Sequence, residues 1–161
     1  MEIIEYDLLK SSLDLAELVP CGTNNYPCKG RFCVPKDVVN FVCSAYKLEK
    51  LAYENLYLLC MSTDGKPVAI MKVSQGGLDY SLTLPYSIFT RVLLTGCRNF
   101  ILIHNHPSGQ VAPSADDLAI TTRIEEGAKL LDLDLQDHII VGSNEYGIQF
   151  FSFLEHGLIK K

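Results

Sequence analysis

The sequence predicts an α/β fold in which helices flank a mixed β-sheet. Short apolar, β-prone runs recur along the chain, and three segments with helical spacing lie among them, two of these between strands. The 161 residues are 48% hydrophobic and 20% charged, which is enough for one domain with its own core. This composition excludes a mainly disordered chain.

The first 33 residues are expected to form an N-terminal extension to the domain. Their apolar positions show no clean period, and residues 19–33 are rich in Gly, Asn and Pro. We therefore place the domain over residues 34–161 and treat residues 1–33 as an extension that precedes it.

The first half of the domain is predicted to contain a helix and a hairpin. Apolar residues recur at helical spacing from Pro35, a residue that suits a first helical turn. The Asp64-Gly65 step separates two β-prone runs, residues 55–61 and 67–73, and so predicts a β-hairpin. Residues 80–84 can form a third strand.

The second half alternates helices and strands. A helix is predicted from Pro85, with Gly96 as its stop, and a buried strand over residues 100–103. A loop then leads to a third helix over about residues 115–131. Its predicted apolar face consists of Leu118, Ile124, Ala128 and Leu131. The sheet is completed by strands over residues 138–142 and 148–153.

The charge balance disfavours nucleic acid as the main partner. Lys and Arg number 14 against 19 Asp and Glu, a formal net charge of −5, and the cations are scattered. A protein that follows a phosphate backbone normally carries a basic stripe. Nucleic acid is therefore a possible but disfavoured partner.

A cytoplasmic location is expected. No run approaches the 18 apolar residues of a spanning helix, and the first ten residues are acidic where a signal peptide would be basic. The six cysteines are then expected to be free thiols. Cys21, Cys28 and Cys33 lack the close pairing of a zinc knuckle, which argues against a second metal site.

The segment that carries chemistry follows the strand at 100–103. His104 and His106 are two residues apart, so both imidazoles can point to one face of a strand. Ser114 and Asp117 occupy the N-cap and third position of the next helix, and the Pro- and Gly-rich loop can bring Asp117 back to the imidazoles. Two histidines and a carboxylate suit a catalytic zinc with an open fourth position. Ser114 and Asp117 also have a purely structural interpretation, because Ser-x-x-Asp is an ordinary helix-capping pattern.

These residues resemble a known family. The pattern HxHPx6SxxD, here His104 through Asp117, matches the JAMM motif of JAB/MPN metalloproteases, and HNHPSGQVAPSADD is similar to the RadC subfamily in particular. The resemblance covers about residues 34–161, including LQDHIIVG and FSFLEHG after the motif.

The resemblance implies a cytidine-deaminase-like mixed sheet and one zinc per chain. The ligands would be His104, His106 and Asp117, and Ser114 would help to hold the oxyanion of a tetrahedral intermediate. The family's acid/base glutamate precedes the first core strand, and the matching position here is Glu54. Without the resemblance, a Glu at a strand's start is usually only solvated.

Two further positions bear on the site. Family members often have an acidic residue where this chain has residues 85–87, Pro-Tyr-Ser, so one rival to Glu54 is missing. His138, in the family-like DHIIVG, is expected to make a structural hydrogen bond.

Three functions compete at this stage. The first is a zinc metallohydrolase that cuts a peptide or isopeptide bond with a metal-activated water. The alternative is a metal-dependent nuclease or DNA-repair factor, which the subfamily's association with DNA repair encourages and the acidic charge opposes. The third is a non-catalytic interaction module, against which the intact Glu54, His104, His106 and Asp117 argue.

Overall fold

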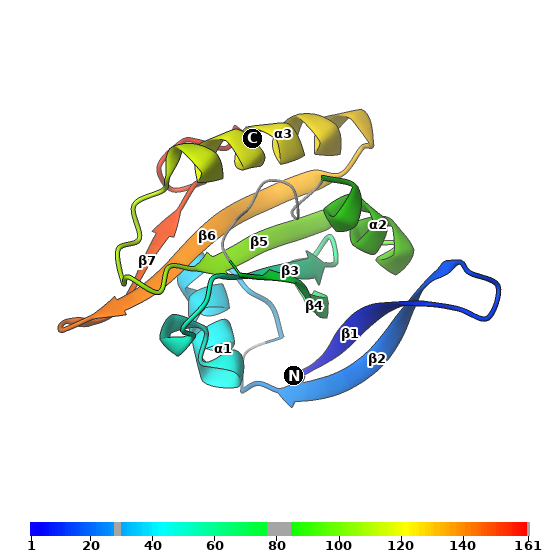
Figure 1. Cartoon of the computed structure of the whole chain (residues 1–161), viewed down its shortest axis with the longest axis horizontal. Helices are drawn as coiled ribbons and strands as arrows, with labels where there is room; N and C mark the ends of the chain where they lie inside the picture. The colour runs from blue at the N-terminus through cyan, green and yellow to red at the C-terminus, as the bar shows by residue number, and fades with distance from the viewer. Residues whose placement is uncertain (28–29, 77–84, 161) are drawn as a thin grey trace.

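The computed structural model describes residues 1–27, 30–76 and 85–160. These residues form one seven-stranded sheet in the order β2-β1-β4-β3-β5-β6-β7, with three α-helices packed on it (Figure 1). The strands are β1 (Glu2–Lys10), β2 (Ala16–Asn25), β3 (Asn55–Met61), β4 (Pro67–Gln75), β5 (Asn99–Asn105), β6 (Asp134–Asn144) and β7 (Gly147–Ser152). The α-helices are α1 (Pro35–Tyr46), α2 (Pro85–Thr95) and α3 (Ala115–Leu130), and a short 3-10 helix, η1, spans Leu48–Lys50.

The predicted mixed sheet is confirmed. β1 pairs with β4, and β5 with β6, in parallel, whereas the other neighbours are antiparallel. β3 and β4 form the predicted hairpin, whose turn includes Gly65 at a φ of +80°. Gly96 follows α2 at a φ of +69°, as a C-terminal stop requires. The strand predicted over residues 80–84 lies outside the described residues.

The sequence pattern indicates no regular element before residue 34, whereas the structure has β1 and β2 there. β1 and β2 form an antiparallel hairpin, and Ile4 and Glu5 of β1 pair with β4, so the hairpin extends the sheet. Ile3 is fully buried, but most of the hairpin's other residues are only partly buried or exposed. This weak burial explains why the apolar pattern gives so little signal. The domain boundary at residue 34 stays a prediction.

The core has two layers, one on each face of the sheet. α2 and α3 cover one face, where Leu58 and Leu102 lie, and α1 covers the other, where Leu59 and Ile103 lie (Figure 1). Neighbouring residues of β3 and β5 thus enter opposite layers, as strand geometry demands. Because β3 and β5 are central strands buried on both faces, they are apolar along almost their whole length.

The predicted face of α3 needs correction. Leu118 and Leu131 are 40% and 45% exposed, although Ile124 and Ala128 are buried as expected. The helix instead turns Asp117 and Thr121 toward the sheet, together with Ile120. The apolar pattern misplaces this face because two of the buried positions, Asp117 and Thr121, are polar. Their side chains form hydrogen bonds with Ser114 and His138.

None of the helices in the described ranges has the length and apolarity that crossing a membrane requires.

Candidate metal centre

The two histidines come from the end of a central strand. His104 belongs to β5 and His106 follows directly after it, so alternation places both side chains on one face of the sheet. Pairing with β6 continues past the end of β5, because the His106 N–H donates to the carbonyl of Val141 on β6 at 2.9 Å. His104 is fully buried and the His106 side chain is 13% exposed.

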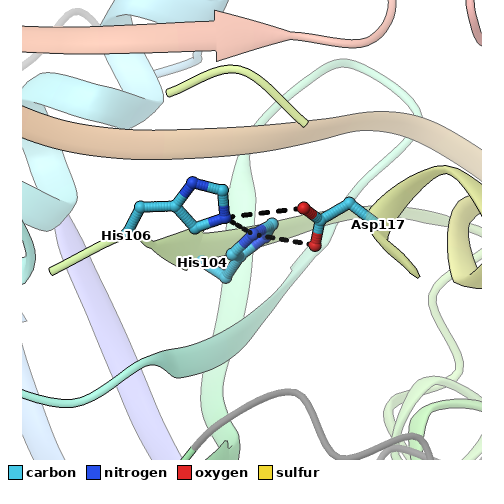
Figure 2. A group of neighbouring side chains, drawn as sticks. All are labelled: His104, His106 and Asp117. Atoms are coloured by element: carbon cyan, nitrogen blue, oxygen red, sulfur yellow. Dashed lines mark hydrogen bonds and ion pairs between the residues drawn. The ribbon is translucent and has the colours of Figure 1, made fainter. Parts of the chain in front are cut away.

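The first turn of α3 supplies the carboxylate. Asp117 is the third residue of the helix, its side chain is fully buried, and it faces both imidazoles (Figure 2). The loop between β5 and α3 returns along β6, where Gly109 and Gly142 pass so closely that a side chain at either would clash with backbone. This close passage leads the chain back toward the histidines.

Three ligand atoms converge in the space between these residues. Nε2 of His104 lies 3.0 Å from Nε2 of His106 and 3.2 Å from Oδ1 of Asp117. Nε2 of His106 lies 3.5 Å from Oδ2 of Asp117. All the potential ligand atoms are within 4.8 Å of one another (Figure 2), and this is the group with metal-ligand geometry that the described residues contain.

The hydrogen bonds behind the site leave these nitrogens available. Nδ1 of His106 lies 2.7 Å from the carbonyl oxygen of Gln110, which can only accept, so Nδ1 carries the proton and Nε2 a lone pair. Nδ1 of His104 is likewise engaged, at 2.8 Å from Nε2 of His138. The structural hydrogen bond expected of His138 is therefore made to a candidate ligand, His104.

Asp117 provides the test of whether a cation fits. Its Oδ2 accepts from the N–H and the hydroxyl of Ser114, at 2.7 and 2.6 Å. Its Oδ1 is buried and has no hydrogen-bond partner; His104 Nε2 is close, but not in hydrogen-bond geometry. A buried carboxylate oxygen without a donor is costly, and a cation between it and the two imidazoles would satisfy it. The residues fit a metal ion.

The electrostatics of the site also favour a bound cation. Burial alone raises the pKa of Asp117, but contacts with His104 and His106 outweigh it and hold that pKa below its usual range. The contact with Asp117 raises the pKa of His106. Burial, followed by the neighbouring His104, keeps the pKa of His138 well below its ordinary value. The centre thus combines an ionised carboxylate with an imidazole, that of His106, which favours binding a positive charge.

Ser114 contacts the ligand group directly. Its hydroxyl accepts from the Asp117 N–H at 3.1 Å, which caps α3, and donates to the Asp117 carboxylate. The ordinary capping function is therefore present, and the same hydroxyl also orients a candidate ligand.

Glu54 lies close enough to the site for its charge to act on His106. Leu56 of β3 is opposite His104 in the antiparallel register, and Glu54 directly precedes β3. Its charge contributes to the raised pKa of His106. The side chain of Glu54 is only partly buried.

Sequence reasoning missed Asn105 and Thr121. Asn105 lies between the histidines and points to the opposite face, where its side chain is buried and bonds residues next to Glu54. Thr121 bonds His138. For Asn105 the alternation of strand side chains was the available signal; for Thr121 it was the spacing of one helical turn from Asp117.

Two other features lie apart from the centre. A cavity of about 160 Å³ is lined by residues at the opposite end of β5, such as Asn99 and Ile101, and by none of the residues of the histidine and aspartate group. Cys21 and Cys33 are exposed free thiols, and Cys28 lies outside the described residues.

Comparison with known proteins agrees with this geometry. The family model described as RadC-like JAB domain matches residues 32–158. A UPF0758 protein from Methanosarcina barkeri is 36% identical over 118 residues, 73% of this chain and 51% of the relative. One from Clostridium perfringens is 38% identical over 112 residues, 70% of this chain and 48% of the relative. One from Alkaliphilus oremlandii is 36% identical over 139 residues, 84% of this chain and 54% of the relative. The chain spans about half the length of these curated relatives.

Proposed function

The chain belongs to the RadC-like JAB domain family, and from this premise we propose that it is a zinc-dependent hydrolase that cleaves a peptide or isopeptide bond of a protein. The observation that carries the proposal is the unsatisfied Oδ1 of Asp117, which is buried 3.2 Å from Nε2 of His104, in a carboxylate whose other oxygen lies 3.5 Å from Nε2 of His106. Two neutral imidazoles and one carboxylate are a ligand set typical of catalytic zinc.

The proposed ligand atoms are Nε2 of His104, Nε2 of His106 and Oδ1 of Asp117. When bound, zinc would lower the pKa of a coordinated water and polarise the carbonyl under attack. The protein's part is to hold three ligands and leave a fourth position open. The partial exposure of His106, beside the fully buried His104 and Asp117, gives that position a side facing solvent.

Glu54 is proposed as the acid/base. Attack on an amide carbonyl requires a group that takes a proton from the water and passes it to the leaving nitrogen. A carboxylate that is not a ligand suits this role, and Glu54 directly precedes β3, whose Leu56 is opposite His104. Its carbonyl accepts from the Gly76 N–H at 2.9 Å, which ties this residue to the end of β4.

Ser114 is proposed to stabilise the oxyanion. Its hydroxyl donates to Oδ2 of Asp117 in this structure, but that oxygen also accepts from the Ser114 backbone N–H. The carboxylate would keep one donor if the hydroxyl turned toward the carbonyl oxygen of a substrate. A donor aimed at the developing charge is worth a factor of about 100–1,000 in rate in other hydrolases.

An amide substrate suits this centre better than a phosphodiester. Phosphodiester cleavage commonly uses two metals or cationic clamps, whereas the described residues contain one group with metal-ligand geometry. The net charge of −5 also weakens affinity for a polyanion.

A substrate panel tests the proposal. The zinc-loaded protein would be incubated with peptides, isopeptide-linked proteins, single-stranded DNA and duplex DNA, each with and without a chelator. We expect chelator-sensitive cleavage confined to the peptide or isopeptide substrates. Chelator-sensitive cleavage of DNA alone would replace the proposal with the nuclease, and a zinc-loaded protein inert toward every substrate would count against hydrolysis.

A further inference from the structure

A chain of hydrogen bonds runs behind His104, on the side away from Asp117 Oδ1. Nδ1 of His104 lies 2.8 Å from Nε2 of His138 on β6. Nδ1 of His138 lies 2.6 Å from the hydroxyl oxygen of Thr121 on α3. That hydroxyl donates to the carbonyl of Asp117 at 2.5 Å, so the chain of bonds returns to a second ligand residue.

The direction of every bond in this chain follows from its last member. A carbonyl oxygen only accepts, so the single hydroxyl proton of Thr121 goes to Asp117. The Thr121 oxygen must then accept from Nδ1–H of His138. A neutral imidazole has one N–H, so Nε2 of His138 accepts from Nδ1–H of His104. Nε2 of His104 is left with its lone pair, facing His106 and Asp117.

The surroundings of His138 favour an uncharged imidazole between His104 and Thr121. It is 1% exposed and stacks on Phe153 with ring centroids 4.8 Å apart. Its ring nitrogens contact an imidazole and a hydroxyl, and neither partner is an anion. A charged imidazole here would be a buried cation without a counterion in contact, which is expensive.

We propose that Thr121 and His138 are positioning residues that fix His104 in the Nδ1–H tautomer, so that Nε2 is always the metal-binding atom. The inference about metal binding rests on the proposed function, whereas the tautomer is a property of the protein alone. Metal-ligating histidines generally need such a partner on their second nitrogen, and its loss weakens metal affinity about 10–100-fold in other proteins.

Thr121 has a matched neighbour for the experiment. The hydroxyls of Thr121 and Thr122 both donate to the carbonyl four residues earlier, those of Asp117 and Leu118. Thr122 is exposed, whereas Thr121 is buried and also contacts His138. Thr121→Val and Thr122→Val therefore each remove an equivalent hydrogen bond to the helix backbone. Only Thr121→Val also removes the contact with His138. Thr121→Ser keeps the hydroxyl.

Two variants of His138 extend the test if Thr121→Val does not fold. His138→Gln can present a carbonyl oxygen near the position of Nε2, and His138→Phe fills the space without an acceptor. Thermal unfolding of the 161-residue chain would check that each variant is folded.

The first measurement is the histidine tautomer of the metal-free protein, by long-range 1H–15N NMR correlations at mildly alkaline pH. We expect His104 in the Nδ1–H form in the wild type and Thr122→Val, and a mixture in Thr121→Val. A wild-type His104 with its proton on Nε2 alone would overturn the proposal, whether or not zinc binds.

The second measurement is Zn²⁺ affinity, by competition with a chromogenic chelator. We expect affinity about 10–100-fold weaker in Thr121→Val and His138→Phe, and near wild type in Thr122→Val, Thr121→Ser and, in part, His138→Gln. Folded Thr121→Val and His138→Phe proteins that bind Zn²⁺ as tightly as the wild type would overturn the proposal. A wild type that binds no Zn²⁺ but shows the expected tautomers would support the positioning and refute the proposed hydrolase.

Discussion

The side chain of Asn105 bonds the peptide groups on both sides of Glu54. Its Oδ1 accepts from the Asn55 N–H at 2.9 Å, and its Nδ2 donates to the Tyr53 carbonyl at 3.0 Å. Asn105 also lies between the two candidate metal ligands of its strand. A single buried amide therefore sets the position of the proposed acid/base relative to the histidines.

Replacing Asn105 should separate catalysis from metal binding. In Asn105→Ala the buried Asn55 N–H loses its acceptor, which should lower the free energy of unfolding by about 1–3 kcal/mol. A displacement of Glu54 near 1 Å would reduce kcat about 100-fold, while zinc content stays at the wild-type level. Urea unfolding, metal analysis and turnover measure these effects.

Asn99→Ala, at the far end of β5, is the control. Among the described residues, the hydrogen bond of the Asn99 side chain is a long one of 3.4 Å to the Ser62 carbonyl. Equal turnover in the two variants would remove Asn105 from the positioning of Glu54.

Neutralising Glu54 should abolish chemistry without disturbing the centre. Glu54→Gln removes the proton carrier and leaves all three ligands, so kcat should fall about 100–10,000-fold at unchanged zinc content. Single-turnover assays on the substrate identified by the panel measure this. Glu126→Gln, an exposed position on α3, is the matched control for loss of one negative charge. Turnover within twofold of the wild type in Glu54→Gln would exclude Glu54 from the mechanism.

Ser114 should matter more for rate than for folding. Loss of the N-cap in Ser114→Ala should cost about 1 kcal/mol of stability. If the hydroxyl also stabilises the oxyanion, kcat should fall by a factor of about 100–1,000. Ser114→Thr, which retains a hydroxyl, should recover most of both losses. A folded Ser114→Ala protein with normal turnover would leave this residue with the capping function alone.

Zinc affinity should fall as the pH is lowered, and the fall should begin above the ordinary histidine range. Protons and zinc compete for Nε2 of His106, and the contact with Asp117 raises the pKa of this imidazole above 6.5. The proton is bound below that pKa and released above it, so affinity should be level at higher pH and decline through the raised value. Asp117, whose pKa is lowered, stays ionised throughout this interval. Chelator competition across this pH range would show it, and an affinity independent of pH there would contradict the assignment of His106 as a ligand.

The parts of the fold and the site that the sequence predicts are those fixed by local geometry. Strand alternation places His104 and His106 on one face, and an N-cap pattern places Asp117 in the first turn of a helix; both are properties of neighbouring residues. The β3–β4 hairpin is predicted for the same reason, since Gly65 and its flanking runs lie within a short stretch of chain.

The parts that escape prediction depend on contacts between distant segments. Asn105 bonds residues about 50 positions earlier, and Thr121 bonds His138 17 positions later, so neither role has a local pattern. The face of α3 is misplaced because burial of Thr121 is favoured by that long-range hydrogen bond rather than by apolarity. The hairpin of β1 and β2 is missed because its pairing with β4 spans some 65 residues and buries few side chains.

Metal stoichiometry tests the central claim most directly. The wild type, His104→Ala and Asp117→Ala would each be dialysed against zinc, freed of excess metal and analysed for zinc per folded chain. His156→Ala is the control, because this histidine bonds Ser152 and stacks on Phe151 rather than facing the centre. We predict about one zinc per chain in the wild type and the control, and loss of that zinc in both ligand variants. Full zinc content in folded His104→Ala and Asp117→Ala proteins would contradict the assignment of the metal centre.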